Sequence, residues 1–255
     1  MMPTPPLAYH DPGFLDSDEG RPIRIVSEYL APLRAFNAAG VTATVVFFGS
    51  ARVRVGGPLG RYLEEAMELA RLVTEWSRSL PGERLLVCSG GGPGIMEAAN
   101  RGAALAGGRS VGLNIGLPQE QRPNPYITPE LGFQFHYFFM RKFWFAYLAK
   151  ALVIFPGGFG TMDELFEILT LAQTDKLAKK ILVIIYGSEY WNRVINFQAF
   201  VDAGTVSPQD SELFRIVDSP DQAFEFLRDG LTTYHLGGTP KRQGEVLPEI
   251  AKTRP

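Results

Sequence analysis

A glutamate just beyond a glycine-rich turn is the first candidate for chemistry in this sequence. Glu164 lies in the stretch FPGGFGTMDELFE (155–167), in which glycine fills three of four consecutive positions before a helical pattern begins. The apolar run before the turn predicts a buried strand, and a helix start presents free N–H groups and about half a positive charge, which favour an anion. A phosphate monoester would suit this turn, to which we assign Gly157, Gly158, Phe159, Gly160 and Thr161.

The acidic residues after the turn have two interpretations. Thr161-Met-Asp-Glu164 fits a capping box, in which the threonine caps the helix and the glutamate reaches back to the N–H of the cap residue. Glu164 also lies at the mouth of the predicted anion site, with Asp163 beside it and Glu167 on the same helix face. Because a carboxylate repels a bound phosphate, the position of Glu164 suggests that it acts on a neighbouring part of the ligand. Glu164 is therefore a candidate catalytic residue, and Asp163 a candidate substrate-binding residue.

Two cations stand in an aromatic segment just before the predicted strand. Nine of the residues in FQFHYFFMRKFWFAYLAK (133–150) are Phe, Tyr or Trp, a composition that predicts a buried helix or a subunit interface. Arg141 and Lys142 lie in its middle, where buried cations are costly unless they are paired. An interface cation pair is one explanation. An anionic ligand, or Glu164 as a partner, explains both cations equally well.

Another glycine loop, which comes earlier in the chain and which we call the first glycine loop, resembles the glycine turn before Glu164. GGPGIME (91–97) and GGFGTMD (157–163) share the pattern Gly-Gly-x-Gly-x-Met-acid. Any tight turn between a strand and a helix favours glycine, but two such loops at one sheet edge favour a phosphate or nucleotide cradle. The chain contains no G-x-x-x-x-G-K-[ST] motif, and an aspartate replaces the third glycine of the dinucleotide fingerprint. The candidate substrate-binding residues of this loop are Gly91, Gly92, Gly94 and Met96.

Strands that alternate with helices must position these loops. Apolar, β-rich runs occur at 41–48, 84–89, 110–115, 151–155 and 180–186, with helical patterns between them at 59–80, 95–108 and 161–175. This alternation predicts an α/β fold, Rossmann-like and doubly wound, with a mainly parallel sheet covered by helices on both faces. Ligands of such sheets bind beyond the carboxyl ends of the strands, where both glycine loops fall. We expect a flexible segment over 1–25, a single nucleotide-binding domain over 26–235 and a flexible tail over 236–255.

Composition excludes several classes of function. The 255 residues are 45% hydrophobic and carry a formal charge of −2, which offers no basic footprint for a nucleic acid polymer. No run approaches the roughly 20 apolar residues of a membrane span. The single cysteine, Cys88, cannot form an internal disulfide, which fits a reducing cytoplasm. Three widely separated histidines make no metal site, and we expect no metal and no cofactor.

Taken together, these motifs resemble the LOG (Lonely Guy) family, whose proteins often carry the label lysine decarboxylase. The family hallmark P-G-G-x-G-T-x-x-E matches Pro156 to Glu164 in full, and its upstream arginine-lysine pair matches Arg141 and Lys142. SGGGPGIMEAANRGA is similar to the other glycine loop of the family, and FFGSAR, with Gly49 and Ser50, to its opening strand and turn. The family commonly has M-H-x-R-K, whereas this chain has Phe138-Phe-Met before the pair, which indicates a divergent branch.

The resemblance implies a phosphoribohydrolase that cleaves a nucleoside 5′-monophosphate, such as a cytokinin riboside monophosphate or an AMP-like nucleotide, into free base and ribose 5-phosphate. The glycine turn would then bind the 5′-phosphate, with Lys142 assisting. Glu164 would stabilise the oxocarbenium-like centre and handle the attacking water, while Arg141 would keep Glu164 ionised or grip the substrate. The resemblance also places Glu120 and Thr170 in the nucleotide pocket.

Other interpretations stay open at this point. Relatives of this fold act as non-catalytic carriers of nucleotide-like ligands, including molybdenum cofactor, but a carrier has no use for a carboxylate beside the scissile bond. Pyridoxal-dependent lysine decarboxylation follows only from the older family label, and no cofactor-lysine setting supports it. The aromatic segment also predicts self-association, with a homodimer as the default assembly and a higher homo-oligomer as the alternative.

Overall fold

A parallel sheet in Rossmann-like order forms the centre of the protein. The computed structural model describes residues 5–81, 85–116, 122–174, 176–177 and 179–237. Within this part of the chain the sheet has seven strands in the order β4-β3-β2-β1-β5-β6-β7, and every neighbouring pair is parallel. The predicted α/β class with a parallel sheet is confirmed. The strands are β1 (Thr44–Phe48), β2 (Leu86–Ser89), β3 (Ser110–Ile115), β4 (Gly132–Phe135), β5 (Ala149–Ile154), β6 (Leu182–Tyr186) and β7 (Arg215–Val217).

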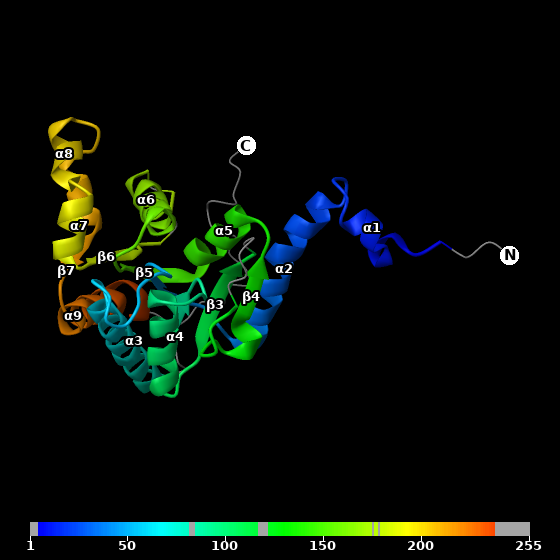
Figure 1. Ribbon diagram of the computed structural model, residues 1–255, viewed down its shortest axis with the longest axis horizontal. Helices are drawn as coiled ribbons and strands as arrows, with labels where there is room; N and C mark the ends of the chain where they lie inside the picture. Colours follow the sequence, from blue (N-terminus) through cyan, green and yellow to red (C-terminus); the bar gives the residue numbers. More distant parts are fainter. Residues whose placement is uncertain (1–4, 82–84, 117–121, 175, 178, 238–255) are drawn as a thin grey trace.

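Helices cover both faces of the sheet (Figure 1). One face carries α3 (Arg61–Ser79), α4 (Ile95–Leu105) and α9 (Pro220–Leu231), and the other carries α2 (Arg21–Ala39), α5 (Phe138–Leu148), α6 (Phe159–Gln173) and α7 (Ser188–Val194). Side chains of β1 alternate between the two cores: Val45 and Phe47 pack toward α3 and α4, and Val46 and Phe48 toward α5. The helices therefore bury the five inner strands almost completely, as the unbroken apolar runs predicted, while the edge strands β4 and β7 stay partly exposed. Short helices α1 (Pro12–Leu15) and α8 (Phe197–Asp202) lie outside these layers.

The direction of winding reverses between β1 and β5. The chain builds the sheet outward from β1 through β2, β3 and β4, and then returns to place β5 on the other side of β1. Such a reversal opens a crevice beyond the carboxyl ends of the two central strands, because the loops that follow them lead to opposite faces. Here the two loops stay joined by backbone hydrogen bonds, from the Phe155 N–H to the Phe48 carbonyl (2.8 Å) and from the Ser50 N–H to the Pro156 carbonyl (3.0 Å).

The aromatic segment is divided among three elements. Its first residues extend the sheet as β4, α5 occupies only Phe138–Leu148, and β5 already begins at Ala149. The carboxylate of Glu28 accepts hydrogen bonds from the N–H groups of His136 and Tyr137, at 2.7 and 3.2 Å, between strand and helix. Trp144 and Phe145 are buried, while Phe138 and Phe139 stay half exposed. Whether this helix mediates self-association stays a prediction.

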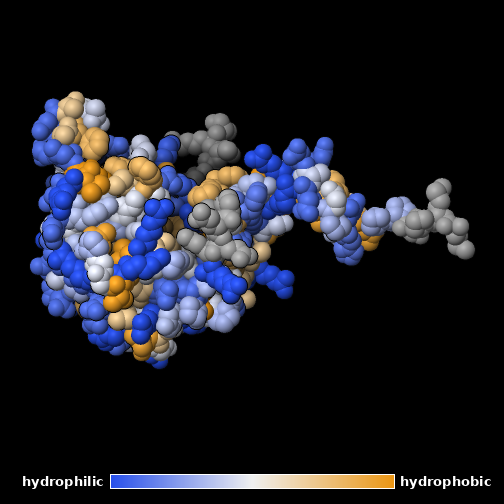
Figure 2. Space-filling model, in the orientation of Figure 1, coloured by the Kyte–Doolittle hydropathy of each residue, from blue (hydrophilic) through white to orange (hydrophobic). Residues whose placement is uncertain are grey.

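Part of the N-terminal segment that we expected to be flexible is helical. The chain forms α1, and α2 already begins at Arg21, with the Arg24 guanidinium donating to the carbonyl oxygens of Leu15 and Ser17. This arm extends away from the body of the protein (Figures 1 and 2). Most of the predicted tail, from 238 onward, lies outside the described residues. No helix in the described ranges has the length and apolar character needed to cross a membrane.

Candidate active site

A cleft of about 540 Å³ opens at the carboxyl ends of β1 and β5. Its walls come from the loop after β1, the start of the first glycine loop, one face of α5 and the start of α6. The crevice that the reversal of winding predicts is therefore present. The residues predicted from the sequence that line it are Gly49, Ser50, Met96, Arg141, Gly158, Phe159, Gly160, Thr161 and Glu164.

Helix α6 begins earlier than the capping-box pattern predicts. Gly158 is the N-cap residue, and no side chain caps the helix there. Thr161 is already inside the helix, with its N–H donating to the Gly158 carbonyl at 3.0 Å. The capping-box interpretation of Thr161 and Glu164 is therefore wrong. Within the described part of the chain no side chain caps the first turn of α6, and its residues Gly158, Phe159 and Gly160 line the cleft.

Thr161 instead explains one glycine of the turn. A Cβ atom at Gly157 would lie 2.1 Å from the Thr161 hydroxyl oxygen, so no larger residue fits without displacing that buried side chain. Gly158 and Gly160 differ, because a Cβ at either would meet nothing within 4 Å. The first glycine allows the turn to close, and the other two leave the backbone open to the cleft.

Glu164 is buried at the inner end of the cleft. Its side chain is 4% exposed, with the Arg141 guanidinium 3.7 Å from Oε1 and the Lys142 ammonium 3.9 Å from Oε2. Among the described residues, Oε1 has no hydrogen-bond partner. A buried carboxylate oxygen without a partner is costly, and it becomes available to a ligand hydroxyl or to a water.

Burial controls the charge of Glu164. Removal from water raises the pKa of this carboxyl to about 7, although Lys142 and Arg141 act in the opposite direction. Arg141 thus favours the ionised form of Glu164, but burial has the larger effect, and its role in holding Glu164 ionised or gripping the substrate stays a prediction. A carboxyl with a pKa near 7 can gain and lose a proton at neutral pH, which suits acid–base chemistry.

Arg141 is held by aromatic rings. Its guanidinium lies 5.1 Å from the centre of the Phe138 ring and 5.6 Å from that of Phe145, both within the range of cation–π contacts. Burial lowers the pKa of Arg141, and Glu164 opposes this shift. Its buried Nε has no hydrogen-bond partner in the described structure. The rings thus orient the cation toward the cleft and leave one donor free.

Lys142 faces a neighbouring cavity instead of the cleft. Its ammonium group lies 2.8 Å from Asp163 and 2.6 Å from Glu167, on the outer side of α6. Burial alone would lower the pKa of Lys142, but hydrogen bonds to these two carboxylates raise it. Lys142, Asp163 and Thr170 line a cavity of about 410 Å³ that is separate from the cleft. None of these three residues lines the cleft, so their role in nucleotide binding stays a prediction.

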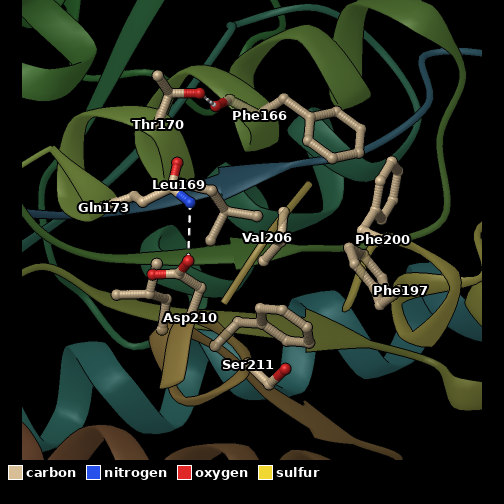
Figure 3. Close-up of a pocket in the computed structure, with 11 residues that line it drawn as sticks. Phe166, Leu169, Thr170, Gln173, Phe197, Phe200, Val206, Asp210 and Ser211 are labelled. Atoms are coloured by element: carbon tan, nitrogen blue, oxygen red, sulfur yellow. Dashed lines mark hydrogen bonds between the residues drawn. The ribbon is translucent and has the colours of Figure 1, made fainter. Parts of the chain in front are cut away.

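Thr170 also borders a second pocket, which is apolar (Figure 3). Its hydroxyl donates to the Phe166 carbonyl at 2.7 Å, within α6. Phe166, Phe197 and Phe200 surround this pocket of about 160 Å³, and a hydrogen bond between Gln173 and Asp210 spans its edge. The structure therefore places Thr170 on the far side of α6 from Glu164.

The first glycine loop reaches the cleft only at its two ends. Gly90 and Met96 line the cleft, whereas Gly91, Gly92 and Gly94 do not. Gly94 has a φ of +68°, and a Cβ there would lie 2.5 Å from the Ser50 carbonyl oxygen, so this glycine allows close packing of two loops. Glu120 lies outside the described residues.

Arg52 is a cleft residue that sequence reasoning missed. It is exposed at the cleft, in the loop after β1, and its N–H donates to the Ser50 hydroxyl at 3.0 Å. Arg52 is the last residue of the FFGSAR stretch. A cation directly after a strand and turn is the pattern that could have identified it as a phosphate-binding candidate. Phe48, Phe145 and Met162 also line the cleft and give it apolar walls that no motif indicated.

Comparisons with known proteins point to one family. A family model described as "Possible lysine decarboxylase" matches residues 96–227. The cytokinin riboside 5′-monophosphate phosphoribohydrolase LOG7 of Arabidopsis thaliana is 31% identical over 189 residues, which cover 72% of this chain and 78% of the relative. The pyrimidine/purine nucleotide 5′-monophosphate nucleosidase of Escherichia coli (strain K12) is 29% identical over 114 residues, which cover 40% of this chain and 24% of that protein.

Solved structures share the fold. The X-ray structure of TM1055, a structural genomics target, aligns with a TM-score of 0.54 at 24% identity and covers 73% of this chain and 99% of that one. The molybdenum cofactor carrier protein of Chlamydomonas reinhardtii aligns with a TM-score of 0.51 at 19% identity, covering 75% and 99%. At these identities the likeness concerns the fold alone.

The raised pKa of Glu164 predicts how stability depends on pH. Between about pH 4.5 and 7 the folded protein keeps a proton that the unfolded chain has released, so this group lowers the free energy of unfolding as pH rises. Glu164→Gln removes this titrating group. The free energy of unfolding of the variant minus that of wild type should therefore increase by about 3 kcal/mol from pH 4 to pH 8. Denaturant unfolding of both proteins across this range measures the difference, and a constant difference would contradict the raised pKa.

Proposed function

The chain belongs to the LOG family, which the model for possible lysine decarboxylases represents, and on that premise we propose that it hydrolyses the N-glycosidic bond of a nucleoside 5′-monophosphate. The products are the free base and ribose 5-phosphate. Relatives named as phosphoribohydrolases and as a nucleotide 5′-monophosphate nucleosidase support a hydrolase of this class. The substrate is a cytokinin riboside monophosphate or an AMP-like nucleotide.

The buried carboxylate of Glu164 is the observation that carries this proposal. It stands at the inner end of a cleft whose outer part presents the first-turn N–H groups of α6. A 5′-phosphate on those groups would extend the ribose inward toward Oε1, which lacks a partner in the described structure. Amides and carboxylate lie on the same helix, so their separation is fixed by the helix itself.

The reaction needs stabilisation of positive charge and activation of water. As the C1′–N bond breaks, its electron pair leaves with the base, and the ribose develops oxocarbenium character. Ionised Glu164 stabilises this centre and accepts a proton from the attacking water, whose oxygen forms the new bond to C1′. The departing base takes up a proton from solvent, and Glu164 returns to solvent the proton that it accepted, so that the net change is the addition of one water. With a pKa of about 7, Glu164 is ionised in a large fraction of molecules at neutral pH.

The two cleft arginines have separate roles in this proposal. Arg141, 3.7 Å from Glu164, favours the ionised carboxylate and has a free Nε for the substrate. Arg52 is exposed at the cleft and supplies positive charge for the phosphate. Apolar walls from Phe48 and Phe145 limit water around the reacting bond, which strengthens electrostatic interactions there.

A non-catalytic carrier of a nucleotide-like ligand is the alternative. The shared fold of the molybdenum cofactor carrier does not distinguish the two, since that likeness concerns the fold alone. Glu164 favours the enzyme, because a carrier of anions gains nothing from a second negative group buried beside its ligand.

We expect the purified protein to release free base from AMP or a related nucleoside 5′-monophosphate, and to leave the corresponding nucleoside intact. The phosphate requirement follows from the amide groups and Arg52, which have no partner in a nucleoside. Chromatography of a panel of monophosphates and their nucleosides measures the products. Tight binding with every nucleotide recovered intact would favour the carrier.

Glu164→Gln should lower kcat by at least about a hundredfold with little change in KM, because glutamine keeps the shape of the side chain but neither accepts a proton nor carries charge. Glu167→Gln is the matched control, one turn further along α6 and facing the cavity beyond Lys142. It should retain most of the activity. Full turnover by Glu164→Gln would show that Glu164 is structural.

Arg52→Ala should raise KM for the nucleotide by about three- to tenfold and leave kcat nearly unchanged, since it removes a charge that binds the phosphate in ground state and transition state alike. The increase should shrink at high salt, because the site is exposed. Arg228→Ala removes an exposed arginine on α9 that pairs with Asp229 at 2.9 Å, and serves as the control. Equal KM values for the two variants would exclude Arg52 from phosphate binding.

A further inference from the structure

A buried polar network lies beneath the first glycine loop, away from the cleft. Ser89, Asn100, Ser110 and Asn124 are each at most 7% exposed, and none of them lines the cleft. Buried polar side chains are costly unless they are satisfied, and a fully connected network rigidifies what it contacts. The proposed hydrolysis uses none of these residues.

Asn124 binds the carbonyl side of the glycine loop. Its backbone N–H donates to the Gly91 carbonyl at 2.8 Å, and its side-chain amide lies 3.1 Å from the Gly91 oxygen and 3.2 Å from that of Gly92. The same amide nitrogen is 3.0 Å from Oδ1 of Asn100. One side chain, more than 30 residues away in sequence, thus holds two consecutive carbonyl groups of the loop.

Asn100 anchors this arrangement to the sheet. Its Oδ1 accepts from the Ser89 hydroxyl at 2.6 Å, and its Nδ2 donates to the Ser110 hydroxyl at 3.0 Å. The Ser89 oxygen in turn accepts from the Gly91 N–H at 3.0 Å. The loop is therefore held on its N–H side by β2 and on its carbonyl side by Asn124, with Asn100 between them.

Close backbone packing links this loop to the cleft. The Ile95 N–H donates to the Ser50 carbonyl at 3.3 Å, and Gly94 leaves no room for even a Cβ beside that oxygen. Ser50 in turn donates its N–H to the Pro156 carbonyl at 3.0 Å, directly before the glycine turn of α6. A displacement of the first loop would move Ser50, and with it both Arg52 and the turn.

We propose that Asn124 is a positioning residue for the cleft: through Gly91 and Gly92 it sets the loop that supports Ser50, and so the place where the sugar phosphate binds. That the ligand is a sugar phosphate rests on the proposed function. The contacts from Asn124 through the first glycine loop to Ser50 are independent of it. Asn124 touches no reacting atom. Its effect is expected on ligand binding and local backbone motion.

Asn124→Asp tests this with minimal change of shape. An ionised aspartate has no side-chain N–H to donate and places negative charge against the carbonyl oxygens of Gly91 and Gly92. Calorimetric titration with ribose 5-phosphate should give binding at least about tenfold weaker than wild type. Asn192→Asp, the same substitution at an exposed position on α7, is the control and should bind like wild type.

Hydrogen exchange separates positioning from general destabilisation and needs no ligand. In Asn124→Asp, amides of residues 50–52 and 90–96 should exchange faster, while those of α9 keep their wild-type protection. Ser89→Ala, which removes the hydroxyl between Gly91 and Asn100, should show the same pattern to a smaller extent and serves if the first variant does not fold. Uniformly faster exchange, or wild-type affinity for ribose 5-phosphate, would overturn the proposal.

The two proposals fail in different ways. Wild-type protein that binds ribose 5-phosphate but cleaves no nucleotide refutes the hydrolase and leaves the role of Asn124 standing. Wild-type protein that cleaves nucleotides while Asn124→Asp does so with the same KM refutes the role of Asn124 alone.

Discussion

The cost of burying one carboxylate determines much of the architecture around the cleft. Glu164 lies away from water, and the two nearest cations stand 3.7 and 3.9 Å from its oxygens, too far for hydrogen bonds. Closer ion pairs would lower its pKa and occupy its oxygens. The distance leaves a carboxyl that titrates near neutrality, with one oxygen that no described residue binds. Arg141 and Lys142 are kept at that distance by other partners, the aromatic rings and the outer carboxylates respectively.

This division of the cations explains why an aromatic helix stands next to a polar site. A guanidinium between Phe138 and Phe145 keeps its charge without an ion pair at contact distance, because the ring faces supply a weaker attraction. Lys142 has the opposite arrangement, with two carboxylates within 2.8 Å. Neighbours in sequence thus serve different cavities, since consecutive helical residues point in different directions.

Sequence patterns predicted the features that depend on residues close together in the chain. Apolar runs predicted the five inner strands, and the glycine turn followed by Glu164 located the cleft. The capping-box assignment failed because Gly158, not Thr161, is the N-cap residue of α6. Strand β4 was missed because most of its residues fall at the start of the aromatic segment, whose composition predicted a buried helix or a subunit interface. The Asn124 network could not be foreseen, because its partners come together only when β2, β3 and α4 pack.

Helix α6 also separates the cleft from an apolar pocket on its other side. Its inner face carries Thr161 and Glu164, whereas Phe166, Leu169 and Gln173 face an apolar pocket that shares no lining residue with the cleft. Because the two cavities share no lining residue, a side chain exchanged at the apolar pocket alters no wall of the cleft. The two sides of this one helix can therefore differ in their contacts independently, a form of modularity within a single element.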